Sequence, residues 1–162
     1  MAYSVIQLTA ANWRNLRSLR LAAIADSADI YGDLLVEQTE PPQYWQQLTE
    51  DQVWLALQDE QDLVGLVGVM ESGPDRYGDF WIKSWWVAPE HRGSGGTRLM
   101  LSWIEQHVTA AGGNEIALGV FDTNLAAISA FEALGFKSVG IRKPSTRPGA
   151  FYIVMSKGVT NQ

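Results

Sequence analysis

The chain has 162 residues, a net charge of −6 at pH 7, no cysteine and two histidines. This composition excludes disulfides, thiolate metal sites and a cysteine nucleophile, and the acidic balance argues against sequence-independent binding of nucleic acid. The first residues lack the basic-then-apolar form of a signal peptide, and no apolar run approaches membrane-spanning length. We therefore expect one cytoplasmic domain over residues 1–162, with no membrane partner.

The first half of the chain predicts a strand, two helices and three strands. These elements are expected over residues 3–8, about 12–25, 42–48, 53–58, 63–70 and 79–88. The first helix is expected to face a core with a stripe at three-and-four spacing, formed by Trp13, Leu16, Leu19, Ala23 and Ile24. Its arginines, at positions 14, 17 and 20, are expected on a solvated face.

The second half of the chain predicts a helix, a strand, a helix and two strands. These elements are expected over residues 97–111, 114–121, 122–134, 137–141 and 151–156. Asp122 is interpreted first as a cap of the helix that follows it, and a basic loop is expected over residues 142–149. Because three strands run together in the middle of an otherwise interleaved order, we predict a mixed α/β sheet, not a purely parallel one.

A glycine-rich turn joins the strand at 79–88 to the next helix. It contains Arg92-Gly93-Ser94-Gly95-Gly96. Glycines let backbone approach a ligand, and a helix start offers unpaired N–H groups, so the turn is a candidate phosphate cradle; taken alone it could equally be only a turn. No Gly-Lys-Ser/Thr follows at Walker spacing, and Arg98 stands where the third glycine of a dinucleotide fingerprint would fall.

Two motifs in order carry a family resemblance. Val87-x-Pro89-x-x-Arg92-Gly93-x-Gly95 resembles the acetyl-CoA loop of the GNAT N-acetyltransferase superfamily, although Thr97 replaces the usual last Gly or Ala. One helix and one strand later, Asn124-x-x-Ala127-x-x-x-Phe131-x-x-x-Gly135-Phe136 resembles the second motif of that superfamily. Phe131 stands where many members have a tyrosine that acts as general acid. The resemblance covers nearly the whole chain and is strongest over residues 85–136.

The resemblance implies a fold, a reaction and a cofactor. The fold would be a mixed, mostly antiparallel central sheet of six to seven strands flanked by about four helices. The reaction would be direct acetyl transfer from acetyl-CoA, without a metal, to a primary amine of a small molecule or peptide. The residues implied in cofactor binding are Trp86, Val87, Arg92, Gly93, Ser94, Gly95, Gly96, Thr97, Asn124 and Phe131.

The general base is left open by the sequence. An alkyl ammonium has a pKa of about 10, so a base helps to make the amine nucleophilic. Asp79 lies at the end of its strand that is far from the glycine loop. Asp122 ends the neighbouring strand, and it is a candidate catalytic residue as well as a candidate helix cap. Glu37 and Glu40 could recognise a cationic acceptor or could equally be solvated loop charges, and Glu71 is a further candidate base without special support. Ser129 is a candidate for the missing tyrosine hydroxyl, or a residue of the helix surface.

Two other functions stay open at this stage. Phe131 stands in place of the usual tyrosine, and no base is obvious. Both observations favour a catalytically weak, regulatory acyl-CoA-binding module. The seven tryptophans allow an interaction domain that binds a partner through exposed rings. The acceptor wall of the superfamily would fall at about residues 26–50, 71–79 and 142–150, and it leaves the acceptor unidentified. A homodimer is compatible with the sequence.

Overall fold

The computed structural model describes residues 2–27 and 34–159. Its strands are β1 (Tyr3–Leu8), β2 (Val53–Asp59), β3 (Asp62–Glu71), β4 (Phe80–Val87), β5 (Glu115–Phe121), β6 (Lys137–Pro144) and β7 (Phe151–Gly158). Its helices are α1 (Trp13–Asp26), α3 (Leu34–Glu37), α4 (Pro42–Asp51), α5 (Gly96–Ala110) and α6 (Leu125–Ala133), with short 3-10 turns at Ala10–Asn12 and Pro89–His91. The predicted order of elements is confirmed, with α3 as an addition.

The strands form one seven-stranded sheet in the order β1-β2-β3-β4-β5-β7-β6. The pairs β1–β2, β2–β3, β5–β7 and β6–β7 are antiparallel, and the pair β4–β5 is parallel. The predicted mixed, mostly antiparallel α/β fold is therefore correct. The chain divides into two compact units, Met1–Met70 with Ser84–Ile104 and Glu71–Lys83 with Glu105–Gln162, which are described separately below.

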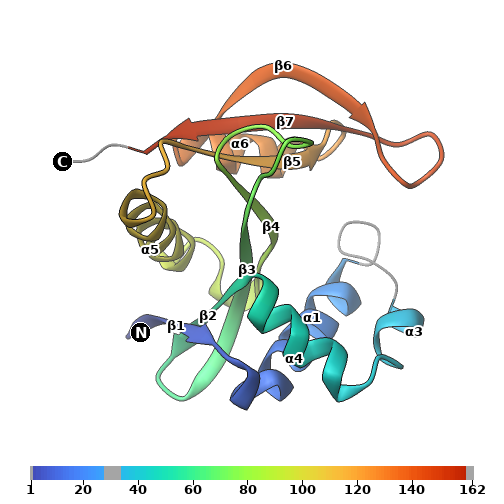
Figure 1. Cartoon of the computed structure of the whole chain (residues 1–162), viewed down its shortest axis with the longest axis vertical. Coiled ribbons are helices and arrows are strands. Elements are labelled where there is room, and N and C mark those ends of the chain that lie inside the picture. Colours follow the sequence, from blue (N-terminus) through green and yellow to red (C-terminus); the bar gives the residue numbers. More distant parts are fainter. Residues whose placement is uncertain (1, 28–33, 160–162) are drawn as a thin grey trace. The chain divides into compact units, whose positions relative to one another are not determined.

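The first unit buries α1 and α4 against strands. Figure 1 shows α1 and α4 side by side near β2 and β3. The buried cluster consists of Leu8, Leu16, Leu19, Ala23, Trp45, Trp54, Ala56, Leu66 and Trp86. The stripe predicted for α1 is buried at Leu16, Leu19, Ala23 and Ile24, with Trp13 partly exposed. Helix α4 begins at Pro42, as predicted. Proline has no backbone N–H, and in the first turn of a helix that N–H would have no partner within the helix.

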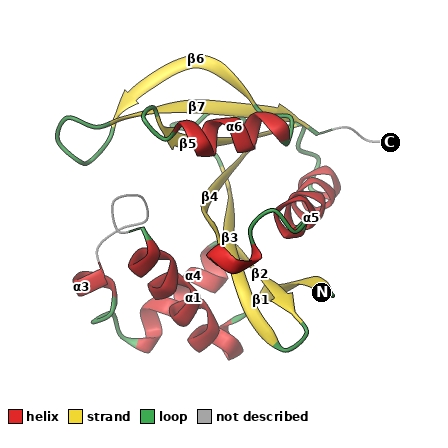
Figure 2. Ribbon diagram, turned by 180° about the vertical axis from the view of Figure 1, so that it is seen from behind, coloured by secondary structure: helices red, strands yellow, loops and turns green. Residues whose placement is uncertain are grey.

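The second unit is built on the antiparallel strands β5, β7 and β6. Helix α6 lies along these strands (Figure 2). Its core includes Ile116, Ala117, Leu118, Phe136, Val154 and Met155. Asp79 fastens the start of β4 to β5, because its Oδ2 accepts from the amides of Asn114 and Glu115 at 2.8 and 3.0 Å. That carboxylate is thus used to order a strand end.

Three expectations need correction. Arg20 does not lie on a solvated face, since its side chain is only 16% exposed and is paired with Glu37. Strand β6 continues to Pro144, so the basic loop begins later than predicted. Of the seven tryptophans, Trp45, Trp54, Trp81 and Trp86 are buried and the other three are partly buried, which removes the basis for an interaction domain that binds through exposed rings.

Candidate functional site

The turn between β4 and α5 owes its shape to glycine. After the 3-10 turn at Pro89–His91, Gly93 and Gly95 adopt φ values of +73° and +91°, in the region that only glycine enters freely. A β-carbon on either glycine would meet nothing within 4 Å, so conformation, not crowding, requires them. Gly96 is different, because its β-carbon would lie 2.3 Å from Leu57 Cδ2, and the start of α5 therefore packs directly on β2.

The backbone amides of this turn are available to a ligand. The amide of Leu99 donates to the carbonyl of Gly95 at 3.1 Å, which is the first turn of α5. Across residues 2–27 and 34–159, no acceptor is found for the amides from Gly93 to Arg98. Such a run, together with the positive end of the α5 dipole, forms a site for an anion such as a diphosphate. The amides on which the sequence interpretation depends are thus not consumed within the described protein.

Arg92 makes two contacts that hold the turn. Its Nε donates to the carbonyl of Val87 at 2.9 Å, and its Nη2 donates to Asp26 Oδ2 at 2.6 Å. The same oxygen of Asp26 accepts from the indole N–H of Trp86 at 3.0 Å. Arg92 therefore joins the end of β4 to the last residue of α1, while its side chain stays 53% exposed.

The pKa of Asp26 is held below its ordinary value by the hydrogen bond from Trp86 and then by that from Arg92. A lowered folded-state pKa adds stability that is present above the unfolded-state value and is lost as the pH falls through the folded-state value. We therefore expect the wild-type protein to exceed an Asp26→Asn variant in free energy of unfolding at pH 6. The difference should shrink below about pH 4. Urea unfolding at several pH values measures it, and a difference that grows on acidification would contradict the assignment.

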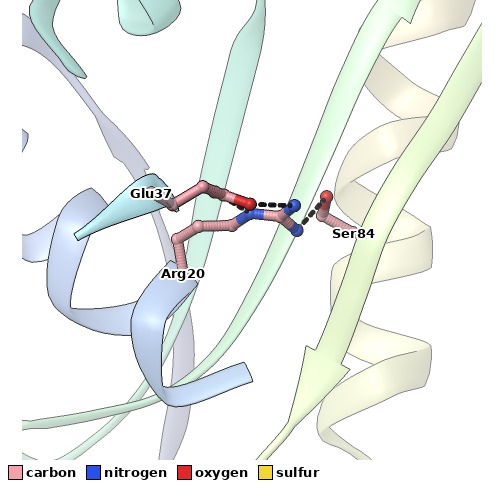
Figure 3. A network of polar contacts seen from close by, with 3 residues as sticks. All are labelled: Arg20, Glu37 and Ser84. Carbon is pink, nitrogen blue, oxygen red and sulfur yellow. Dashed lines mark hydrogen bonds and ion pairs between the residues drawn. The ribbon is translucent and has the colours of Figure 1, made fainter. Parts of the chain in front are cut away.

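Arg20, Glu37 and Ser84 form a second polar network, shown in Figure 3. The Nε and Nη2 of Arg20 donate to the two carboxylate oxygens of Glu37 at 2.8 and 3.1 Å, a side-on ion pair. The Nη1 of Arg20 donates to Ser84 Oγ at 2.9 Å. Ser84 lies within β4 but has φ of +55°, which is unfavourable for a residue with a β-carbon.

Tyr44, on α4, lies within the electrostatic influence of this network. Tyr44 is partly buried and packs edge-to-face on Trp45 at 5.0 Å between centroids. Burial raises the pKa of the Tyr44 phenol, and the charges of Glu37 and Glu40 raise it further. Both carboxylates therefore act on the same hydroxyl. Residues 28–33, which the sequence places in the acceptor wall, lie outside the described residues.

The remaining candidates belong to the second unit. Asn124, not Asp122, caps α6, since its side chain accepts from the amide of Ala127 at 3.2 Å. Asp122 instead accepts from Arg142 Nε at 2.9 Å, so the reading of Asp122 as the cap is wrong. Ser129 is exposed on α6, and Phe131 packs edge-to-face on Phe136 at 5.8 Å. The roles of these residues in catalysis or cofactor binding stay predictions.

The sequence interpretation missed Asp26, Arg20 and Ser84. Asp26 gave no signal, because an acidic residue at the end of a helix is ordinarily solvated. Ser84 did give one: a small polar residue interrupts the aromatic strand Trp81-Ile82-Lys83-Ser84-Trp85-Trp86. Over the described ranges, no group of three or more His, Cys, Asp or Glu side chains could hold a metal ion. Nor does the same part of the chain contain a helix long and apolar enough to span a membrane.

A family model described as "Acetyltransferase (GNAT) family" matches residues 8–136. A comparison with curated proteins gave no match. Among solved structures, yncA from Salmonella typhimurium, solved with its cofactor acetyl-CoA, superimposes with a TM-score of 0.75 at 16% identity. That match covers 100% of this chain and 96% of yncA.

Two further structures show the same fold. A chimera of the spermidine N-acetyltransferase SpeG from Vibrio cholerae and hSSAT matches with a TM-score of 0.73 and 18% identity, covering 98% of this chain and 96% of the chimera. The ribosomal-protein-S18-alanine N-acetyltransferase from Escherichia coli matches with a TM-score of 0.69 and 14% identity, covering 99% and 96%. At these identities the likeness is one of fold.

Proposed function

Because the chain belongs to the acetyltransferase (GNAT) family, we propose that it transfers an acetyl group from acetyl-CoA to a primary amine of a small molecule or peptide. The observation that carries the proposal is the run of amides from Gly93 to Arg98, for which the described residues supply no acceptor. Gly93 and Gly95, whose φ values are positive, shape this run just before and at the start of a fifteen-residue helix. That is the chemistry a diphosphate needs, and acetyl-CoA carries one.

In this proposal the parts of the turn have separate tasks. The amides of Gly93 to Thr97 hold the diphosphate, and Arg92 keeps the turn in place while adding positive charge nearby. Trp86 and Val87, at the end of β4, bring a backbone N–H to the thioester carbonyl, where negative charge develops during the reaction. The assignment of Asn124 and Phe131 to the cofactor site stays a prediction.

The reaction balances without a covalent enzyme intermediate. The amine nitrogen attacks the thioester carbon, the C–N bond forms, and the C–S bond breaks as the tetrahedral intermediate collapses. The amine loses one proton, and the departing thiolate, whose conjugate thiol has a pKa near 8.5, takes one up. With no cysteine in the chain, a cysteinyl-enzyme route is closed.

The acceptor is proposed to be an amine that carries a positive charge before it reacts. At the Tyr44 hydroxyl the negative charges of Glu37 and Glu40 outweigh the positive charge of Arg20, and the chain as a whole has a net charge of −6, so the field favours a cation. Structural neighbours are named for spermidine and for the alanine of a ribosomal protein. We therefore propose polyamines and peptides with a free N-terminus as the first acceptors to test.

Titration calorimetry with acetyl-CoA, followed by a CoA-release assay against these amines, tests the proposal. We expect one binding event per chain, and turnover that requires an amine. Desulfo-CoA serves as a control, because it retains the diphosphate and should bind without reacting. Absence of binding by both molecules would defeat the proposal.

A second function is favoured by Phe131, which packs against Phe136 and offers no hydroxyl to a departing thiolate. In that case the protein is a regulatory module that binds acyl-CoA with little or no catalysis. The two experiments separate the functions. Binding with turnover above background selects the enzyme, and binding without turnover against any amine tested selects the module.

A further inference from the structure

Ser84 interrupts β4 at a chemically unusual point. It has φ of +55°, and Glu60, in the turn between β2 and β3, is the other non-glycine residue with positive φ among those described. A turn residue adopts this conformation readily, whereas a serine inside a strand does so only when its surroundings fix it. Trp85, Trp86 and Val87 follow directly, so the conformation of Ser84 sets the direction of this segment. In the proposed function, the same segment brings a backbone N–H to the thioester carbonyl.

Arg20 supplies the contact that fixes Ser84. Its Nη1 donates to Ser84 Oγ at 2.9 Å, so this contact depends on the orientation of the guanidinium plane. Glu37 holds it, through two hydrogen bonds of 2.8 and 3.1 Å to the other edge of the guanidinium. The pair is 16% and 15% exposed, which leaves little water to compete with these contacts.

Helix α1 thus supports β4 at two points. Arg20 holds Ser84 and, six residues later, Asp26 accepts from the indole N–H of Trp86. The ends of the segment from Ser84 to Trp86 are therefore both bonded to one helix. A serine with a fixed neighbour on α1 can keep a backbone conformation that it would otherwise leave.

We propose that Arg20 is a positioning residue, oriented by Glu37, which keeps Ser84 in the left-handed conformation and thereby aims the end of β4 at the thioester. This inference rests on the proposed function, because it concerns the segment that would polarise the carbonyl. According to this inference, α1 and α3 affect kcat and leave the Kd for acetyl-CoA unchanged.

A set of variants tests the inference through the backbone preference of residue 84. Ser84→Ala removes the hydroxyl but keeps a β-carbon, so the left-handed conformation loses its support. Ser84→Gly also removes the hydroxyl, but glycine adopts this conformation without cost. We expect Ser84→Ala to lower kcat about tenfold or more, and Ser84→Gly to keep kcat within about threefold of wild type. The Kd for acetyl-CoA should change little in both.

Arg20→Met is combined with Glu37→Gln, so that no partly buried carboxylate is left unpaired. The double variant should lower kcat about tenfold in the wild-type background and have little further effect in the Ser84→Gly background. Arg17→Met is the matched control, since Arg17 lies one turn away on α1 and donates to the carbonyl of Gln38 at 3.1 Å. An equal loss of kcat in both backgrounds, or a loss expressed only in the KM of the amine, would overturn the inference.

The unfolding free energy provides a readout that does not depend on activity. By urea titration, Arg20→Met with Glu37→Gln should destabilise the wild-type background more than the Ser84→Gly background. If acetyl-CoA binds to none of the proteins, the proposed function fails, and the coupling between residues 20 and 84 is still decided by this measurement. Equal destabilisation in the two backgrounds would refute the role of Arg20.

Discussion

Replacing Gly95 by alanine should raise the Kd for acetyl-CoA about a hundredfold. Gly95 has φ of +91°, outside the conformations that a residue with a β-carbon occupies comfortably, and the cost of such a conformation is about 1–3 kcal/mol. The added methyl group meets no protein atom within 4 Å, and it stands within the run of amides to which we assign the diphosphate. Backbone strain and contact with the ligand then act together. Calorimetry measures the change.

Gly112→Ala is the matched control for this substitution. Gly112 follows α5 with φ of +83°, and a β-carbon there also meets nothing within 4 Å. The backbone cost is therefore similar, while the residue lies outside the proposed site. We expect both variants to lose stability in urea by about 1–3 kcal/mol, and only Gly95→Ala to lose affinity. Equal affinities in the two variants would remove the glycine turn from cofactor binding.

The fold followed from the sequence because its elements carry strong local signals. The stripe at Leu16, Leu19, Ala23 and Ile24 is spaced as a helix face must be, and those four residues are buried. Pro42 begins α4 where its missing N–H costs nothing. Helix α3 was missed because Leu34–Glu37 is a single turn, too short to show a period. The extension of β6 through Pro144 was missed because proline and two basic residues are typical of a loop, yet an edge strand tolerates them.

The site was only partly predictable, because much of its order comes from contacts distant in sequence. The glycines at 93 and 95 stand out in the sequence, and the structure gives both a positive φ. By contrast, Asp26 and Arg92 are 66 residues apart, and Arg20 and Ser84 are 64 apart. No periodic pattern links such pairs. The positive φ of Ser84 also interrupts the regular alternation of side chains along β4, which a sequence pattern alone does not reveal.

The contacts of Arg92 raise a question about its task. The sequence resemblance implies that Arg92 binds the cofactor. In the structure, however, its Nε donates to the carbonyl of Val87 and its Nη2 donates to Asp26. If Arg92 acts by bracing the turn, a lysine cannot replace it, because one ammonium does not reproduce the fork of two directed donors. If it acts by charge alone, lysine suffices. The substitution Arg92→Lys therefore separates bracing from charge.

We expect bracing to dominate, with Arg92→Lys raising the Kd for acetyl-CoA about tenfold although the charge is kept. Asp26→Ala should have a similar effect, and the double variant should be little worse than either single one, because both remove the same support. Arg142→Lys is the control, since Arg142 and Asp122 form an ion pair with nearly the same exposure, 56% and 27% against 53% and 25%. Charge alone would instead leave Arg92→Lys at wild-type affinity and let Asp26→Ala bind more tightly, because the guanidinium would be released to the diphosphate.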